Sequence, residues 1–309
     1  MPARQPENYQ KDSSHTLLDP RVLAHIKDYR LLARMAARGF LAGAHRSLTS
    51  GQGSEFLQYR DYIVGEDLKF VDWKLYARSD RLLSKRFVEH TQANCYLLVD
   101  TSASMDYTGE DSPCSKLHYA TMLCAAIAWL ARHQGDSVGL ITYNDEIQDW
   151  LPPASDSSQL DRILKTLYRM KTKGKANHKK VMDKLSGNLT NSGIVVLLSD
   201  MIDDGNVLPG LFRFSATRGY EGVAMQILDE DEIKFPFSGS MIFEDLETRS
   251  HIRTNPQIIR KNYLTRFKNE QNIIASEFAL HQTEYFCTKT CDDLALALSR
   301  YFDKRRMVR

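Results

Sequence analysis

The stretch NCYLLVDTSASM, residues 94–105, joins an apolar run to oxygen-bearing side chains that could bind a metal ion. The run ends at Asp100, and Ser102 and Ser104 follow it at a spacing of two residues. A second apolar run, GIVVLLSD, also ends in a carboxylate, that of Asp200. Carboxylate and hydroxyl oxygens suit hard cations such as Mg²⁺ or Mn²⁺, which take near-octahedral coordination and retain waters. These residue types predict a cation site if the fold brings the two runs side by side.

The two runs belong to an alternation of strand-like and helix-like patterns that extends over residues 93–309. Several of the apolar runs lack polar alternation, which indicates strands that are buried on both faces. Strands that alternate with helices predict an α/β fold with a doubly wound, mostly parallel sheet flanked by helices. In such sheets ligands bind beyond the carboxyl ends of the strands, where Asp100 and Asp200 would lie. A hairpin-like pattern near residues 234–256 predicts an insertion into this domain.

The part of the chain before residue 93 has a different character. Residues 1–16 are polar and predict a disordered tail. Residues 17–92 predict an N-terminal extension with a helix and a small β-containing part, and the helix is expected to begin near Pro20 and end near Gly39. Six Lys or Arg residues and one acid between 21 and 46 suit a solvated helix face or, alternatively, a basic arm for an acidic partner.

The composition is that of an ordinary globular protein. The 309 residues are 42% hydrophobic and 26% charged, and their formal net charge of +2 favours no anionic partner. Five cysteines at these spacings do not form a disulfide framework and indicate a reducing compartment. The N-terminus lacks a signal-peptide pattern, and the longest apolar run, ATMLCAAIAWLA, is shorter than the ~20 residues that a membrane helix needs. We therefore expect a cytoplasmic protein without membrane insertion.

Two other interpretations of the strand-end residues remain open. Ser102 and Ser104 could cap the helix expected from residue 115, with Asp100 as a turn residue. The alternative function is a metal-dependent hydrolase acting on phosphoesters, but phosphatases of the haloacid dehalogenase type need a second Asp where this chain has Ser102. The sequence also contains no phosphate-binding loop, no G-x-S-x-G elbow and no evident nucleophile–base pair. We expect a protein that is not an enzyme.

The segment DTSASM resembles the D-x-S-x-S metal-ion-dependent adhesion site of von Willebrand factor A domains. Residues 59–90 resemble the signature of the domain of unknown function 58 family, and FEDLET, residues 243–248, is similar to a later motif of that family. The signature is matched by Arg60, Tyr62, Gly65, Glu66, Asp67, Asp72, Trp73, Ala77 and Arg78. The resemblance covers residues 20 to 305 and implies a von Willebrand factor A-like fold with the N-terminal extension packed on it.

The same resemblance implies a set of metal ligands in the first and third loops: Asp100, Ser102, Ser104 and Asp200. The threonine that such sites carry in their second loop has no clear counterpart, because Ala176 falls at its expected position. Water, Thr172 or Asn177 would then have to supply the missing oxygen. We therefore expect Mg²⁺ or Mn²⁺ to bind weakly.

Members of the family are typically linked with MoxR-type AAA+ ATPases, which implies a partner of that kind in a chaperone-like or complex-maturation role. The signature segment offers aromatic and charged residues of types that are enriched at interfaces, and we expect partner binding by Arg60, Asp72, Trp73 and Arg78. The alternative is that Trp73 packs internally while Asp72 and Arg78 pair with each other. Acidic residues interrupt the positive field of this segment, so we expect no nucleic-acid binding.

Together these features predict a non-enzymatic, metal-dependent protein-interaction module. Its cation site would leave one coordination position open for an Asp or Glu of the partner. Metal and partner would then bind together.

Overall fold

The computed structural model describes residues 18–47, 56–63, 71–79, 81–87, 93–189, 192–202, 212 and 219–307. The chain divides into two compact units, of which the larger comprises residues 1–43 and 92–309 and the smaller comprises residues 44–91. The tail expected over residues 1–16 lies outside the described residues.

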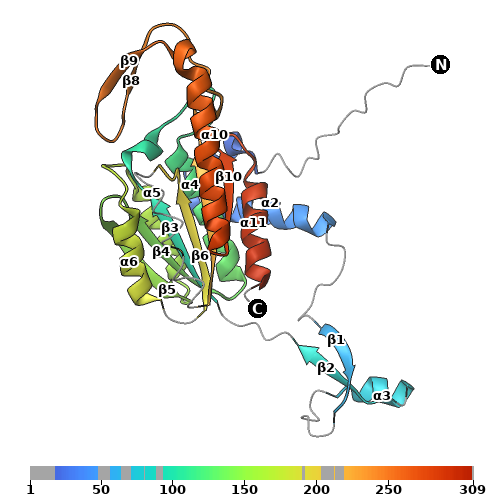
Figure 1. Cartoon of the computed structure of the whole chain (residues 1–309). Coiled ribbons are helices and arrows are strands. Elements are labelled where there is room, and N and C mark those ends of the chain that lie inside the picture. The colour runs from blue at the N-terminus through green and yellow to red at the C-terminus, as the bar shows by residue number, and fades with distance from the viewer. Residues whose placement is uncertain are drawn as a thin grey trace, which may run out of the picture. The chain divides into compact units, whose positions relative to one another are not determined.

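A six-stranded sheet forms the centre of the larger unit, in the order β10-β7-β6-β3-β4-β5 (Figure 1). Neighbouring strands are parallel except for β4 and β5, which are antiparallel. The strands are β3 (Asn94–Asp100), β4 (Ser137–Tyr143), β5 (Ile147–Ala154), β6 (Gly193–Ser199), β7 (Tyr220–Leu228) and β10 (Thr283–Lys289). The prediction of a doubly wound, mostly parallel α/β sheet is confirmed.

The order of these strands has a direct consequence for the position of a ligand. The chain winds from β3 outward to β5 and then returns to β6, on the other side of β3. The strand order therefore reverses between β3 and β6, which is the switch point at which open α/β sheets bind ligands. The two strands pair in parallel, from Asn94 opposite Gly193 to Val99 opposite Leu198.

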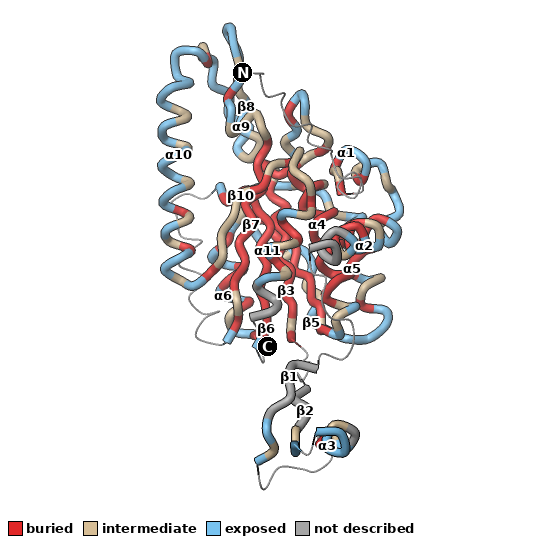
Figure 2. The backbone as a smooth tube through the Cα atoms, turned by 90° about the vertical axis from the view of Figure 1, so that its right-hand side faces the viewer, coloured by how far each residue is buried: buried red, intermediate tan, exposed pale blue. Residues whose placement is uncertain are grey.

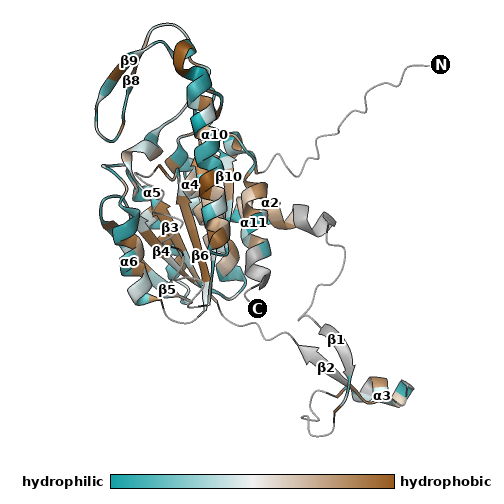
Figure 3. Cartoon of the chain, viewed as in Figure 1, coloured by the Kyte–Doolittle hydropathy of each residue, from teal (hydrophilic) through white to brown (hydrophobic). Residues whose placement is uncertain are grey.

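Helices cover both faces of the sheet. One core cluster contains Leu97 and Val99 of β3, together with residues of α2 (Tyr29–Ser47), α4 (Lys116–His133), α5 (Gln159–Arg169) and α11 (Leu294–Met307). The other cluster contains Tyr96 and Leu98, together with residues of α6 (His178–Asn188) and α10 (Pro256–Leu280). Side chains of a strand alternate between its two faces, so both faces of β3 are apolar and buried. Figure 2 shows the burial of the central strands, and Figure 3 shows their hydropathy.

The N-terminal helical pattern differs from the expected single helix. It forms α1 (Pro20–Leu23) and α2, because the Asp28 carboxylate accepts hydrogen bonds from the backbone N–H groups of Arg30 and Leu31 and starts a new helix. Helix α2 continues through Gly39. Its buried residues Leu32, Ala33, Ala36 and Ala37 belong to the main core cluster. The pattern predicts one extension over 17–92, but most of α2 is thus part of the larger unit.

Several short elements stand at the carboxyl edge of the sheet. The turn η3 (Ala103–Asp106) follows β3, and α9 (Glu230–Lys234) follows β7. Strands β8 (Met241–Glu244) and β9 (His251–Thr254) form an antiparallel hairpin within the segment 234–256. Figure 1 shows this hairpin beyond the end of the sheet at which the arrowhead of β6 points.

The smaller unit contains β1 (Phe56–Asp61), β2 (Leu83–Phe87) and the short helix α3 (Trp73–Ser79). The two strands are antiparallel, with Asp61 opposite Leu83. This unit carries most of the signature segment described above.

All five cysteines are free, in agreement with the absence of a disulfide framework. Within the described part of the chain, none of the helices has the length and apolar character that crossing a bilayer requires.

Candidate metal-binding site

The carboxylates of Asp100 and Asp200 stand at the switch point, at the ends of β3 and β6. Both residues are buried, with exposed fractions of 0% and 1%. Burial raises the pKa of Asp100, and the negative charge of Asp200 adds to the increase. Each carboxylate thus influences the other, because the parallel pairing of their strands brings the two strand ends together.

The hydroxyl groups of Ser102 and Ser104 lie beside these carboxylates, with their oxygens 3.0 Å apart. The Ser102 backbone N–H donates to Asp100 Oδ1 at 2.8 Å, and the Ser199 hydroxyl donates to Asp100 Oδ2 at 2.6 Å. Burial opposes the charge of Asp200, but Lys116 and, to a smaller extent, Ser104 hold its pKa below the usual value. The loop after β3 therefore brings its hydroxyls to the same point as both acids.

The interpretation of these serines as caps of the following long helix is wrong. Helix α4 is capped by Ser115, whose hydroxyl accepts from the His118 backbone N–H at 3.2 Å. Ser102 precedes η3 but makes no side-chain capping bond there. The two hydroxyls are thus not needed to satisfy helix termini.

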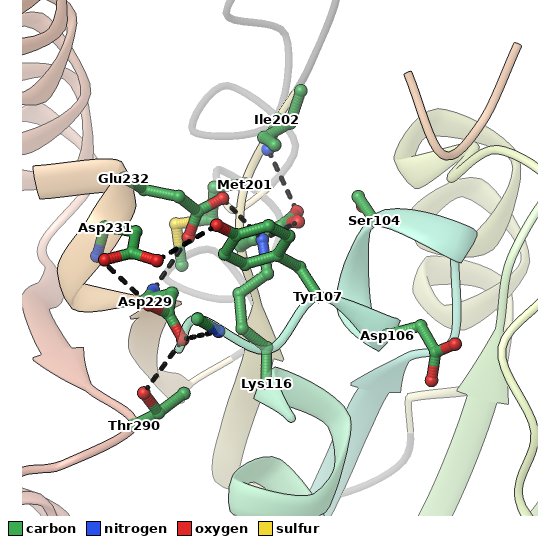
Figure 4. A network of polar contacts seen from close by, with 12 residues as sticks. Ser104, Asp106, Tyr107, Lys116, Met201, Ile202, Asp229, Asp231, Glu232 and Thr290 are labelled. Carbon is green, nitrogen blue, oxygen red and sulfur yellow. Dashed lines mark hydrogen bonds and ion pairs between the residues drawn. The ribbon is translucent and has the colours of Figure 1, made fainter. Parts of the chain in front are cut away.

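Lys116 is a site residue that the sequence did not reveal. Its side chain is 1% exposed, and its Nζ lies 2.8 Å from both Asp200 Oδ2 and Glu232 Oε1 (Figure 4). Burial opposes its charge, but the two carboxylates outweigh burial and raise the pKa of Lys116. One feature of the sequence could have indicated Lys116: it is a lysine in the first turn of an apolar helix, where the helix dipole disfavours positive charge.

Lys116 lies equally close to Asp200 and Glu232, but burial affects the two acids differently. Burial acts against the charge of Asp200, yet Lys116 outweighs it and holds the pKa of Asp200 below its usual value. The pKa of Glu232, in contrast, is raised by burial despite Lys116. One buried ammonium group therefore serves two acidic side chains.

The backbone after Asp200 is strained. Met201 has a φ of 56°, which is uncommon for a residue other than glycine. This turn is held by the Met201 N–H, which donates to Ser199 Oγ at 2.9 Å, and by the Ile202 N–H, which donates to Asp200 Oδ1 at 3.3 Å. Such strain is concentrated at functional positions.

His178 is a second site residue that the sequence did not reveal. It is buried, and its Nδ1 lies 3.0 Å from the Tyr143 hydroxyl. Its Nε2 is buried without a hydrogen-bond partner in the part of the chain that the structure describes. His178 lines the same cavity as Ser104 and acts electrostatically on Asp100. A buried nitrogen that has no hydrogen-bond partner among the described residues is rare in proteins, and it makes His178 a candidate site residue.

The second loop, residues 170–177, packs on the first. The Lys173 N–H donates to the Thr101 carbonyl at 2.9 Å, and the Ala103 N–H donates to the Gly174 carbonyl at 2.8 Å. Of the three residues considered for the second-loop position, Ala176 lines the cavity with Ser104, as does Asn177. The Asn177 side chain accepts from the Lys180 N–H and caps α6, and Thr172 lines a different cavity.

A cavity of about 530 Å³ opens over these groups. Its walls come from η3 and the start of α4, the second loop, α9, and the turn between β8 and β9. Among the described residues, no three His, Cys, Asp or Glu side chains are placed to hold a metal ion by themselves. The converging donors are two carboxylates and two hydroxyls, a set that fits a cation such as Mg²⁺, which retains waters.

The four residues expected to bind a partner all belong to the smaller unit. Arg60 lies on β1, opposite Ser84 of β2. Asp72 Oδ1 accepts from the Leu75 N–H at 3.1 Å at the start of α3, and Arg78 is exposed on that helix. Trp73 is 54% exposed, with its ring edge-on to Tyr76 at 6.3 Å. Within the smaller unit, Trp73 is therefore not part of a packed interior.

The strand order and the oxygen-bearing switch point define an α/β protein with a candidate cation site at the carboxyl edge of its sheet. The family described as "Protein of unknown function DUF58" matches residues 58–273, and the chain belongs to this family. The "Uncharacterized protein Rv1480" of Mycobacterium tuberculosis is 25% identical over 233 residues, which are 74% of this chain and 72% of that protein. A Mycobacterium bovis protein, Mb1516, is similar to the same extent.

Two solved structures are similar to this chain at lower identity. "Conserved hypothetical protein BatB" from Bacteroides thetaiotaomicron is 15% identical, with a TM-score of 0.46, over 70% of this chain and 99% of that one. The "SpRpn10 VWA domain" is 11% identical, with a TM-score of 0.41, over 68% of this chain and 95% of that one.

Proposed function

We propose that the protein is a non-enzymatic, cytoplasmic protein-interaction module whose partner binding depends on Mg²⁺ or Mn²⁺. The observation that carries the proposal is the meeting of two buried carboxylates and two hydroxyls at the switch point of the sheet. The residues that would hold the cation are Asp100, Ser102, Ser104 and Asp200. When bound, the cation would supply a positive centre that attracts a carboxylate of the partner.

The protein's own residues prepare this site. The hydrogen bonds from Ser199 and from the Ser102 N–H occupy one lone pair on each Asp100 oxygen and fix the orientation of that carboxylate. Lys116 keeps Asp200 charged. Orienting groups of this kind determine metal affinity as strongly as many direct ligands do.

The partner that we propose is a AAA+ ATPase of the MoxR type. This proposal rests on the resemblance of the signature segment to its family. The exposed Trp73 supports a contact through the smaller unit, because exposed aromatic residues are frequent anchors at interfaces.

The direct test is a pull-down with a purified MoxR-type ATPase from the same organism. We expect retention of the ATPase in Mg²⁺ and its loss when a chelator is added, and Asp100→Ala should reduce retention similarly. Trp73→Ala tests the smaller unit separately. Retention that neither the chelator nor Asp100→Ala changes would contradict metal-dependent binding, and Mg²⁺-dependent phosphatase activity that needs Asp100 would favour a hydrolase.

A second prediction concerns Ala176, which contributes no oxygen to the cavity that it lines. Ala176→Thr should strengthen Mn²⁺ binding by about 1 kcal/mol, the typical net contribution of one added polar contact. Titration calorimetry on the wild type and the variant measures this difference. Thr172→Ala is the matched control, since Thr172 lines another cavity and should not affect binding. Identical isotherms for Ala176→Thr and the wild type would show that Ala176 does not occupy the second-loop position.

A further inference from the structure

The turn of the β8–β9 hairpin reaches the candidate site from a distant part of the sequence. Glu247 lies on this turn, is half-buried and lines the same cavity as Ser104 and His178. Burial and the charge of Asp200 raise the pKa of Glu247, while Ser104, which is one of the expected cation ligands, acts in the opposite direction. Glu244, on the same hairpin, also lines this cavity, but its carboxylate is paired with Arg249 at 2.9 Å.

The turn that carries Glu247 is ordered by its own hydrogen bonds. The Asp245 carboxylate accepts from the N–H groups of Glu247 at 2.8 Å and Thr248 at 3.1 Å, and from the Thr248 hydroxyl at 2.6 Å. The Arg249 N–H donates to the Asp245 carbonyl at 2.8 Å. These bonds fix the backbone at Glu247, so its position over the cavity is built into the turn.

The base of the hairpin is fixed by aromatic packing. Phe243 stacks on Phe235 with ring centroids 5.8 Å apart and meets Phe237 edge-on at 5.3 Å. Phe235 also stacks on Tyr263 of α10 at 4.3 Å. Tyr263 in turn donates a hydrogen bond to the carbonyl of Glu232, in α9, at 2.8 Å. The hairpin is thus connected to the same short helix that supplies a partner for Lys116.

The charges around Glu247 favour a cation. Asp100 and Asp200 both act on it with negative charge, and Lys175, which is exposed, opposes them. The buried ammonium of Lys116 is already engaged by Asp200 and Glu232. The cavity therefore contains several carboxylates, one buried ammonium group and His178, whose Nε2 has no hydrogen-bond partner in the described part of the chain. A divalent cation would offset this excess of negative charge.

We propose that Glu247 is an intramolecular ligand, whose carboxylate takes the coordination position that a partner's acidic residue would otherwise fill. The β8–β9 hairpin then competes with the partner, which binds only when the hairpin withdraws from the site. This inference rests on the proposed function, because it requires the cation site at Asp100 and Asp200.

The test measures Mn²⁺ binding by titration calorimetry and counts the exchangeable waters on bound Mn²⁺ by water-proton relaxation. Glu247→Gln should weaken Mn²⁺ binding about tenfold, the scale on which groups around a metal site affect affinity. It should also add one exchangeable water, which acetate should displace. The wild type should not respond to the same concentration of acetate, because Glu247 occupies that position.

Two further variants separate the possible results. Glu244→Gln is the matched control on the same hairpin. Glu244 also lines the cavity, but its carboxylate is paired with Arg249 in an exposed ion pair, so this variant should behave as the wild type. Asp100→Ala should bind no Mn²⁺. Glu247→Gln and the wild type could show the same Mn²⁺ affinity and the same number of exchangeable waters while Asp100→Ala fails to bind Mn²⁺. That result would overturn the role of Glu247 as an intramolecular ligand but would still support the cation site. If the wild type binds no Mn²⁺, both the cation site and the role of Glu247 as its ligand are overturned.

Discussion

Lys116→Met should lower the free energy of unfolding by about 3–5 kcal/mol, the usual cost of removing one member of a buried ion pair. The variant leaves the buried carboxylate of Asp200 and the mostly buried carboxylate of Glu232 without their cation. Methionine has similar length, so the loss reports charge rather than a cavity. Urea denaturation followed by circular dichroism measures the change, and an unchanged m-value would show that the transition itself is the same.

The control for this experiment is Lys180→Met. Lys180 also lies 2.8 Å from a carboxylate, that of Glu146, but both side chains are more than half exposed. Exposed pairs contribute little, so the unfolding midpoint should hardly move. An equally small change for Lys116→Met would contradict the role of Lys116 as the counter-charge of Asp200. Added Mn²⁺ should restore part of the stability lost in Lys116→Met, because a bound cation supplies positive charge near Asp200.

Asp100→Ala should abolish stabilisation by divalent cations. A ligand that binds only the folded state at a hundred times its dissociation constant raises the unfolding free energy by about 2.7 kcal/mol. The wild type should therefore gain about this much in saturating Mn²⁺, and Asp100→Ala should gain nothing. The quantity to compare is the gain in unfolding free energy when Mn²⁺ is added. The substitution itself removes a buried carboxylate and therefore also changes the stability of the metal-free protein.

Asp106→Ala is the matched control for Asp100→Ala. Asp106 lies on the same loop but is exposed, and Figure 4 shows its carboxylate directed away from Lys116. It lines the other cavity, with Thr172 and Tyr29. This variant should retain the full Mn²⁺ increment in thermal denaturation. If neither Mn²⁺ nor Mg²⁺ changes the thermal stability of the wild type, the cation site and the function proposed from it are both contradicted.

The sequence by itself determined the sheet and the carboxylates at its edge. Hydrophobic periodicity is a local signal, and the apolar runs before Asp100 and Asp200 are long enough to identify strands without knowledge of their neighbours. Parallel α/β winding then requires strand ends to meet at one edge. The spacing of Ser102 and Ser104 behind Asp100 was equally local, so the four expected ligands could be named before any contact was known.

Some local patterns were nevertheless misread. The helical periodicity of the N-terminal region continues across the break between α1 and α2, because the Asp28 cap interrupts the hydrogen bonding without disturbing the apolar spacing. The edge strand β5 contains Pro152 and Pro153, which weaken a strand signal and are tolerated only at an edge or a bulge. The sequence left both an internal and an interface position open for Trp73, because the exposure of a side chain depends on what surrounds it.

Only the tertiary structure decided which charges surround the strand ends. Lys116 lies 84 residues from Asp200 and 116 from Glu232 in the sequence, and no periodicity connects them. His178 reaches the cavity because α6 begins beside the second loop, and Glu247 reaches it because aromatic packing holds the β8–β9 hairpin at the edge of the sheet. Electrostatic interaction depends on distance in space, so a site assembled from several separate segments becomes visible only when the chain is folded.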